Sequence, residues 1–304
     1  MNTISAALFA VVLALPAPTA APPKGKSFDN PKQAADALVQ AVASDDTATM
    51  LEILGPDGKK IVSSADEVKD KNDRENFTAL AKEKTEVVTD KTDVHLAKLV
   101  IGPDAWPFPV PIRQTGAKWH FSTKEGLREI LMRRIGQDEL DAIQVCHGYV
   151  EAQQEYASQA RDVTGSHMYA QRILSTAGKR DGLAWYDADG KPAGPIGENV
   201  AKAIEEGYTR RDKPYHGYFF MILKAQGPAA RHGQLDYVIQ GKMIGGFALV
   251  AWPAEYRATG VKTFIVNHEG VVYEKDLGPD TTKLASGMTA YNPDKTWKKV
   301  PEAE

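Results

Sequence analysis

The order of helical and strand-like patterns along the chain is the feature that most restricts its fold. Apolar residues recur at helical spacing over residues 30–82, and β-rich or period-two patterns follow over residues 87–121. A second helical pattern covers residues 124–160, and strand-forming runs dominate the last third of the chain. Helices and strands that occur in separate blocks are typical of the α+β class. We therefore expect two α+β domains, covering residues 28–125 and 126–300.

The first domain is predicted to hold N-terminal helices followed by an antiparallel hairpin. Asn30 is suited to cap the first helix, because its side chain can accept a backbone hydrogen bond, and Pro31 suits the first helical position. Thr115-Gly116 is a turn signal between two β-rich runs. The expected elements are helices beginning at Pro31, Thr47 and Ala65, and the hairpin with its turn at Thr115-Gly116.

The second domain is predicted to be a long helix packed on a C-terminal antiparallel β-meander. Gly136 is expected to break the helix, and apolar residues after it define one stripe. The turn Asn267-His268-Glu269-Gly270 has the length of a hairpin loop between two β-rich runs. The stripe is expected to include Leu140, Ile143, Val150 and Ala157, and the strands to lie near residues 218–223, 247–252, 263–266 and 271–273.

The N-terminus indicates export from the cell. Residues 4–15 form a run of 12 residues without a charge, followed by small residues and prolines. A helix of that length reaches about 18 Å, too short to cross a hydrocarbon core of about 30 Å. We therefore expect a signal peptide over residues 1–21, a flexible leader over 22–27, and a periplasmic or secreted protein with no stable membrane insertion. The alternative is a buried N-terminal helix.

Composition narrows the classes of function. Hydrophobic residues make up 42% of the chain and charged residues 25%, which are ordinary globular values. A formal net charge of -3 offers no basic field for nucleic acid. The single cysteine, Cys146, excludes an internal disulfide and any zinc cluster built from several cysteines. A thiol nucleophile needs a base that faces it, but the neighbouring His147 would point about 100° away from Cys146 on a helix. Cys146 is therefore interpreted as a small buried residue.

Six stretches of the sequence carry a resemblance to a known family. They are RRIG at 133–136, YVEAQQEYA at 149–157, GKRDGL at 178–183, PYHGY at 214–218, GGFALVAWPAEY at 245–256 and VYEKDLG at 272–278. With these stretches the chain resembles an uncharacterised bacterial family, domain of unknown function 2950, from about residue 28 to residue 300. The resemblance implies an exported bacterial protein with no known activity or catalytic residue.

A second resemblance concerns only the second half of the chain. The helix around residues 139–143, the following Gly-Tyr-Phe strand and the segments 251–256 and 259–264 are similar to the globular domains of bacterial pseudopilins. The chain departs from them in lacking a prepilin helix attached directly to that domain. The resemblance implies a pilin-like fold, and a loop that holds calcium in some pseudopilins. The N-terminal part is loosely similar to cystatin-like or nuclear-transport-factor-like domains.

Two sets of polar residues are candidates for chemistry. An enzyme site at the junction of the two domains would use His216, Glu255 and Asp181, since pockets often form at domain interfaces. Packing is the alternative role for His216, which lies between two tyrosines. Carboxylates near strand ends could hold calcium, although salt bridges or solvation are the alternative because no EF-hand spacing is present. The calcium candidates are Asp236, Glu274 and Asp276.

Three functions compete. The leading hypothesis is a non-enzymatic exported protein, without a cofactor, that binds envelope or secreted proteins through its β-rich second domain. The second is an envelope hydrolase with the site named above. The third is a small-ligand carrier that uses the concave sheet of the first domain around Trp106, Phe108 and Trp119.

Overall fold

The computed structural model describes residues 25–63, 67–158, 167–187, 189–196 and 214–301, and it divides the chain into two compact units. Unit 1 covers Met1–Glu129 and unit 2 covers Ile130–Glu304, so the division falls four residues after the predicted domain boundary. Each unit has its own cluster of buried hydrophobic residues. The predicted signal peptide and residues 22–24 of the predicted leader lie outside the described residues.

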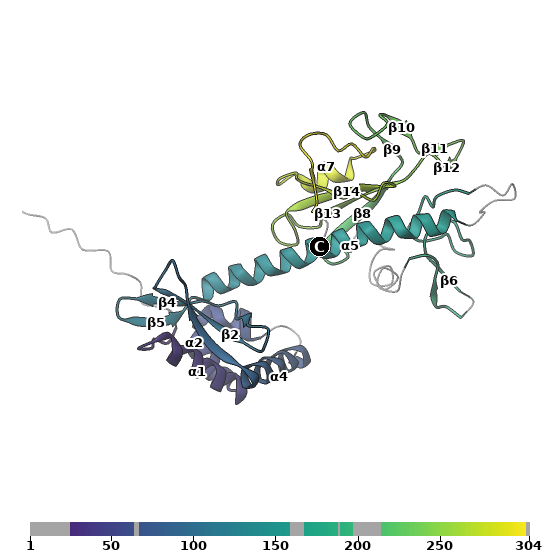
Figure 1. The fold of residues 1–304 in the computed structure, drawn as a ribbon. Coiled ribbons are helices and arrows are strands. Elements are labelled where there is room, and N and C mark those ends of the chain that lie inside the picture. The colour runs from purple at the N-terminus through teal and green to yellow at the C-terminus, as the bar shows by residue number, and fades with distance from the viewer. Residues whose placement is uncertain (1–24, 64–66, 159–166, 188, 197–213, 302–304) are drawn as a thin grey trace, which may run out of the picture. The chain divides into compact units, whose positions relative to one another are not determined.

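Unit 1 begins with helices that cover one face of a sheet (Figure 1). The Asn30 side chain accepts a hydrogen bond of 2.9 Å from the Gln33 backbone N–H, and Pro31 opens the first helix, which confirms the predicted cap. The helices are α1 (Pro31–Ala43), α2 (Thr47–Leu54), the 3₁₀ helix η1 (Pro56–Gly58), α3 (Lys59–Val62) and α4 (Glu67–Glu83).

The sheet of unit 1 is antiparallel, in the order β1-β2-β4-β5, with β3 also paired to β2. Thr115 pairs with Lys118 across the turn, and the turn residue Gly116 has a φ of 60°, which confirms the predicted hairpin. The strands are β1 (Thr85–Thr89), β2 (Leu96–Ile101), β3 (Trp106–Pro107), β4 (Ile112–Thr115) and β5 (Lys118–Phe121).

The end of the predicted flexible leader is held against unit 1. The Lys26 backbone N–H donates to the carbonyl of Glu52 at 3.0 Å. Phe28 exchanges two backbone hydrogen bonds of 2.8 Å with Trp119. Lys26 lies within the predicted leader of residues 22–27, whose flexibility stays a prediction.

Unit 2 is built on an antiparallel sheet in the order β16-β15-β14-β13-β8. Strands β13 to β16 follow one another as a meander, and β8 pairs with the other edge of β13. The strands are β8 (Tyr218–Leu223), β13 (Ala248–Pro253), β14 (Lys262–Asn267), β15 (Tyr273–Asp276) and β16 (Lys298–Lys299). The smaller pairs are β6 (Trp185–Tyr186) with β7 (Pro192–Ala193), β9 (Ala225–Gln226) with β10 (Leu235–Asp236), and β11 (Val238–Ile239) with β12 (Lys242–Met243).

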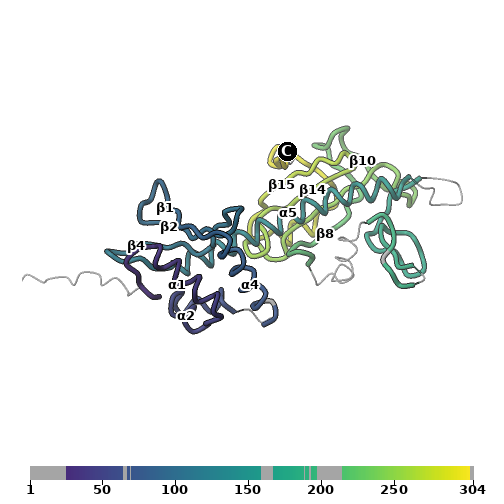
Figure 2. The backbone as a smooth tube through the Cα atoms, turned by 60° about the horizontal axis from the view of Figure 1, so that its bottom comes forward, coloured from purple at the N-terminus to yellow at the C-terminus, as the bar shows by residue number. Residues whose placement is uncertain are grey.

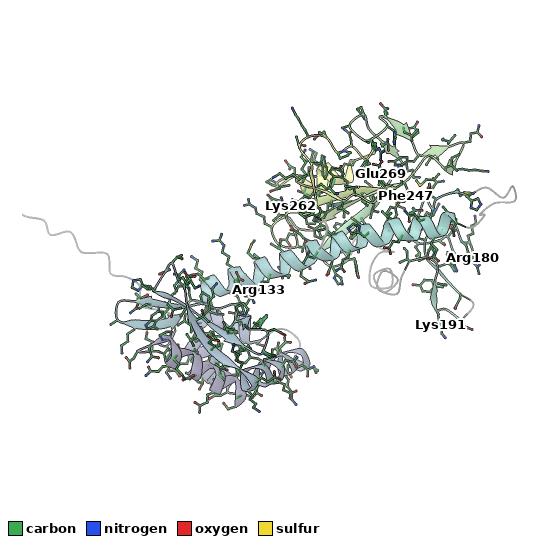
Figure 3. All side chains as sticks on the ribbon, viewed as in Figure 1. Arg133, Arg180, Lys191, Phe247, Lys262 and Glu269 are labelled. Atoms are coloured by element: carbon green, nitrogen blue, oxygen red, sulfur yellow. The ribbon has the colours of Figure 1, made fainter. Side chains whose placement is uncertain are left out.

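Helix α5 (Thr123–Ala157) packs its second half on this sheet (Figures 1 and 2). The Tyr149 hydroxyl donates to the Ala248 carbonyl at 3.3 Å, and its ring centroid lies 5.5 Å from that of Phe247. Figure 3 labels Phe247 in unit 2. All six residues of β13 are buried, so both of its faces are covered, and α7 (Thr281–Ser286) also contacts this strand. The predicted α+β class, with a long helix on a C-terminal meander, is confirmed.

Two details predicted for the long helix are wrong. α5 passes through Gly136 without a break, since a single glycine costs a helix only about 1 kcal/mol. Leu140 is 56% exposed and does not face the sheet. Val150 of the predicted stripe is buried, and Ile143 packs against the core. Small residues and tyrosines supply much of the rest of the buried face, namely Ala142, Cys146, Tyr149, Ala152 and Tyr156, together with the amide of Gln153.

Cys146 is fully buried in this helix–sheet contact, as expected. Burial raises the pKa of its thiol to about 12, because the thiolate would lose its hydration. The thiol therefore stays protonated at neutral pH and contributes to packing. In the part of the chain that the structure describes, no helix combines the length and apolar character needed to cross a membrane.

Candidate ligand-binding pocket

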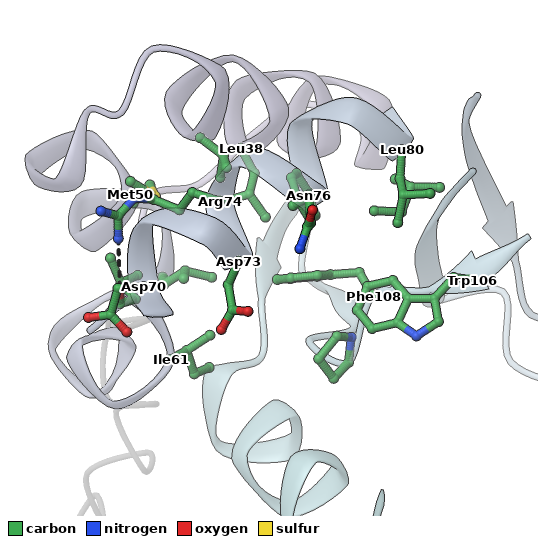
Figure 4. Close-up of a pocket in the computed structure, with 16 residues that line it drawn as sticks. Leu38, Met50, Ile61, Asp70, Asp73, Arg74, Asn76, Leu80, Trp106 and Phe108 are labelled. Atoms are coloured by element: carbon green, nitrogen blue, oxygen red, sulfur yellow. Dashed lines mark hydrogen bonds between the residues drawn. The ribbon is translucent and has the colours of Figure 1, made fainter. Parts of the chain in front are cut away.

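A cavity of about 480 Å³ lies within unit 1 (Figure 4). Helices α1 to α4 supply most of its wall, and β2, β3 and the residues directly after β3 supply the rest. Most of the lining is apolar. The apolar lining residues are Leu38, Val42, Met50, Leu54, Ile61, Val62, Phe77, Leu80, Ile101, Trp106, Phe108 and Pro109.

Helix α4 contributes both polar and apolar groups to the cavity. Its lining residues include Asp70, Asp73, Arg74, Phe77 and Leu80, which recur at spacings of three and four and so share one face of a helix. The rest of the helix is strongly charged. Although α4 is highly charged in sequence, it therefore presents one stripe of residues to the cavity.

Phe108 is the centre of an aromatic cluster at the cavity. Its ring centroid lies 5.6 Å from that of Phe77, 6.4 Å from Trp106 and 6.2 Å from Phe121, all in edge-to-face geometry. Such pairs stabilise the ring positions beyond simple burial. The cluster gives this part of the wall a defined shape.

The turn between β2 and β3 is tied to the C-terminal end of α4. The Gly102 N–H donates to the carbonyls of Leu80 at 3.2 Å and Lys84 at 3.0 Å. Gly102 has a φ of 73°, and a Cβ atom there would come within 3.0 Å of Leu80 Cδ2. Glycine is therefore required for this turn, which holds Trp106 at the same end of the cavity as Leu80 (Figure 4).

The opposite end of the cavity holds its charged side chains. Asp70 and Ile61 lie at this end, with Asp73 nearby (Figure 4). Arg74 Nε lies 2.6 Å from Asp45 Oδ1, and Arg74 Nη1 donates a long hydrogen bond of 3.5 Å to the Val62 carbonyl. The guanidinium is thus engaged by groups of the protein itself.

A family model described as a protein of unknown function, DUF2950, matches residues 25–300. The chain belongs to this family. The match covers the described parts of both units, so the cavity and the β-meander are both features of the DUF2950 region. No curated protein and no solved structure matches the chain. The similarity of unit 2 to pseudopilins is not shown and stays a prediction.

Two of the three aromatic residues predicted for a carrier site line the cavity of this DUF2950 protein. Trp106 and Phe108 belong to its wall. Trp119 does not, because it is buried in the core of unit 1. The prediction missed the lining residues of α4. Phe77 and Leu80, three residues apart, were the signal that this helix has an apolar stripe.

The three residues predicted for catalysis all belong to unit 2, and each has a different neighbour. The Asp181 carboxylate accepts from the Thr176 backbone N–H at 2.7 Å and from its hydroxyl at 2.8 Å. The Glu255 backbone N–H donates to Thr259 Oγ1 at 3.1 Å. His216 Nδ1 contacts the carboxylate of Asp141 on α5. Their joint catalytic role stays a prediction.

The His216 contact comes from a tight turn. Tyr215 and Tyr218 exchange two backbone hydrogen bonds, of 2.9 and 2.8 Å, around His216 and Gly217. Both central residues have positive φ, at 42° and 72°, as in a type I′ turn. The carboxylate beside the imidazole thus belongs to Asp141, which sequence reasoning did not identify.

Asp138, one turn before Asp141, is the other carboxylate close to this turn. A Cβ atom at Gly217 would come within 2.8 Å of its Oδ2. Burial raises the pKa of Asp138, and the charge of Asp141 acts in the same direction.

The calcium candidates have other neighbours in the structure. Glu274 makes an ion pair with Lys262 at 3.5 Å. Asp276 accepts from the Tyr256 hydroxyl at 3.2 Å and from the Gly278 backbone N–H at 2.8 Å. Asp236 is exposed on β10. Among the described residues, no group of three or more His, Cys, Asp or Glu side chains is arranged to hold a metal ion.

Proposed function

We propose that this DUF2950 protein is a non-enzymatic binding protein whose unit 1 holds a small apolar ligand. The observation that carries the proposal is the cavity of about 480 Å³ with an apolar wall and polar groups at one end. Ligand sites in proteins are typically concave, mostly apolar and about 300–1,000 Å³ in volume, with few polar groups that orient the ligand.

The size of the cavity favours a ligand over imperfect packing. Protein interiors are close-packed, and few of their voids exceed the space of a water molecule, about 30 Å³. Trp106 is 43% exposed and Leu80 is 37% exposed, although both line the cavity. A ligand that covers these side chains removes their apolar surface from water, which favours binding by about 25 cal/mol per Å².

Trp106 provides a direct readout of occupancy. We expect the tryptophan emission of the protein to shift to shorter wavelength as decanol is added, because the ligand displaces water from the Trp106 indole. The shift should saturate and yield a dissociation constant in the micromolar range, about -8 kcal/mol. The measurement is a fluorescence titration of the full chain.

The control for this titration is Trp106→Phe, which keeps an aromatic ring in the wall. This variant should bind decanol by calorimetry but lose the shift, since the other four tryptophans lie outside the cavity lining. An equal shift in the variant would place the ligand elsewhere. Absence of saturable binding in both proteins would refute the proposal.

The proposed site of action is outside the cytoplasm. The charge-free run over residues 4–15 supports export, and the family match begins after it, at residue 25. Mass spectrometry of protein from the producing cell should find a chain that begins near residues 18–22. Intact cytosolic protein that still carries Met1 would contradict export. Binding of envelope or secreted proteins by unit 2 stays a prediction.

A further inference from the structure

The floor of the cavity is apolar and buried. Its most deeply buried lining residues come from α1, α2 and β2, and each of them is at most 3% exposed. They are Leu38, Met50, Leu54 and Ile101. A polar group placed against these side chains would lose its hydration without gaining a hydrogen bond, which is unfavourable. The floor therefore accepts the apolar part of a ligand.

The exposed lining residues form a rim along α4 and β3. Asp73, Asn76 and Leu80 follow one another on α4 at spacings of three and four, so they share one side of the helix. Trp106 contributes to the rim from β3. A ligand whose apolar part lies on the floor would keep its polar group at this rim, where water still reaches it.

Asn76 offers an uncharged polar contact at the rim. It is the one amide side chain in the described lining of the cavity. Figure 4 shows it between Asp73 and Leu80, with its amide pointing into the cavity. The amide forms no hydrogen bond with the residues that the structure describes. It has an oxygen that accepts and an NH₂ group that donates, so it can bond a hydroxyl, a carbonyl or an amide.

The charged lining residues differ from Asn76 because they are engaged within the chain. Arg74 Nε lies 2.6 Å from Asp45 Oδ1. Asp70 and Asp73 also have interactions with other parts of the protein. A ligand that bonded one of these groups would have to compete with a contact that already exists. Asn76 offers both kinds of hydrogen bond without that competition.

We propose that Asn76 is the residue that selects the ligand, and that the ligand carries an uncharged hydrogen-bonding group, such as an alcohol or an amide, on an apolar body. This rests on the proposed function of the cavity, and it names the class of its ligand. The apolar body packs on the buried floor, and the uncharged group bonds the Asn76 amide at the rim.

The test measures how the loss of the amide affects two probes, 1-octanol and 1-chlorooctane. They have the same chain, but chlorine replaces the hydroxyl and is a poor hydrogen-bonding group. Asn76→Leu removes the amide with little change in side-chain volume. We expect it to weaken the binding of octanol about fivefold, the usual net value of one hydrogen bond. Chlorooctane should bind at least as tightly as before, because leucine is apolar. Fluorescence titration through Trp106 measures both affinities.

Asn72→Leu is the matched control. Asn72 is exposed on α4, one turn before Asn76, and it does not line the cavity. The same substitution there should leave the affinities for both probes within about twofold of those of the unmodified protein. A circular dichroism spectrum checks that each variant is folded.

The outcomes separate the two proposals. If neither probe binds the unmodified protein, the proposed function itself fails. If both probes bind, but Asn76→Leu weakens octanol no more than chlorooctane, the cavity is a binding site and the inference about Asn76 is wrong. An equal loss of octanol binding in Asn72→Leu would also overturn it, because the effect would come from an added surface leucine.

Discussion

Replacement of Gln153 by alanine is expected to lower the free energy of unfolding of unit 2 by about 3 kcal/mol. The side chain of Gln153 is fully buried. Its amide group accepts from the Ala170 N–H at 2.8 Å and donates to the Ala170 carbonyl at 2.7 Å and to the Tyr149 hydroxyl at 3.0 Å. Alanine would leave buried backbone groups without partners. Urea unfolding followed by circular dichroism measures the change.

Gln154 is the matched control. It is the next residue of the same helix, but its side chain is exposed. Gln154→Ala should change the free energy of unfolding by less than about 0.5 kcal/mol. Equal effects of the two substitutions would mean that the amide of Gln153 does not hold the segment around Ala170 to α5.

Replacement of Leu80 by tryptophan is expected to weaken the binding of decanol at least about thirtyfold, or about 2 kcal/mol. Leu80 lines the cavity, and the larger indole would occupy space that the ligand needs. The residue is partly exposed, so we expect the folded state to accept the larger side chain with a loss of at most about 1 kcal/mol. Isothermal titration calorimetry measures the affinity.

Leu284→Trp controls for the addition of a surface indole. Leu284 lies on α7 in unit 2 and is also partly exposed. It is not part of the cavity wall. This variant should bind decanol as the unmodified protein does. Unchanged binding in Leu80→Trp, with the protein folded, would show that decanol does not occupy the cavity.

The first helix cap and the hairpin turn of unit 1 were predicted correctly from local sequence patterns. Asn30 and Pro31 mark the start of α1, and the turn at Thr115-Gly116 joins β4 to β5, because caps and tight turns depend on a few adjacent residues. The stripe of α5 was predicted only in part, because Val150 is buried whereas Leu140 is exposed. Which residues of a helix face the sheet depends on how closely the two approach, and small residues such as Ala142 permit contact that Leu140 does not.

The candidate site was predicted only for lining residues in β3 and directly after it. Trp106 and Phe108 were proposed as aromatic residues near the predicted sheet. The residues that α4 contributes to the cavity wall were not predicted. Whether a charged helix also lines a cavity depends on tertiary packing. The contact of His216 with Asp141 was missed for a similar reason, since 75 residues separate the two in the sequence.

Occupancy of the unit 1 cavity can be read from the nuclear Overhauser spectrum of the full protein with decanol bound. We expect contacts between the alkyl chain of decanol and the rings of Phe77, Trp106 and Phe108. Contacts only to residues of unit 2, or a bound alkyl chain that shows none to these rings, would contradict occupancy of this cavity.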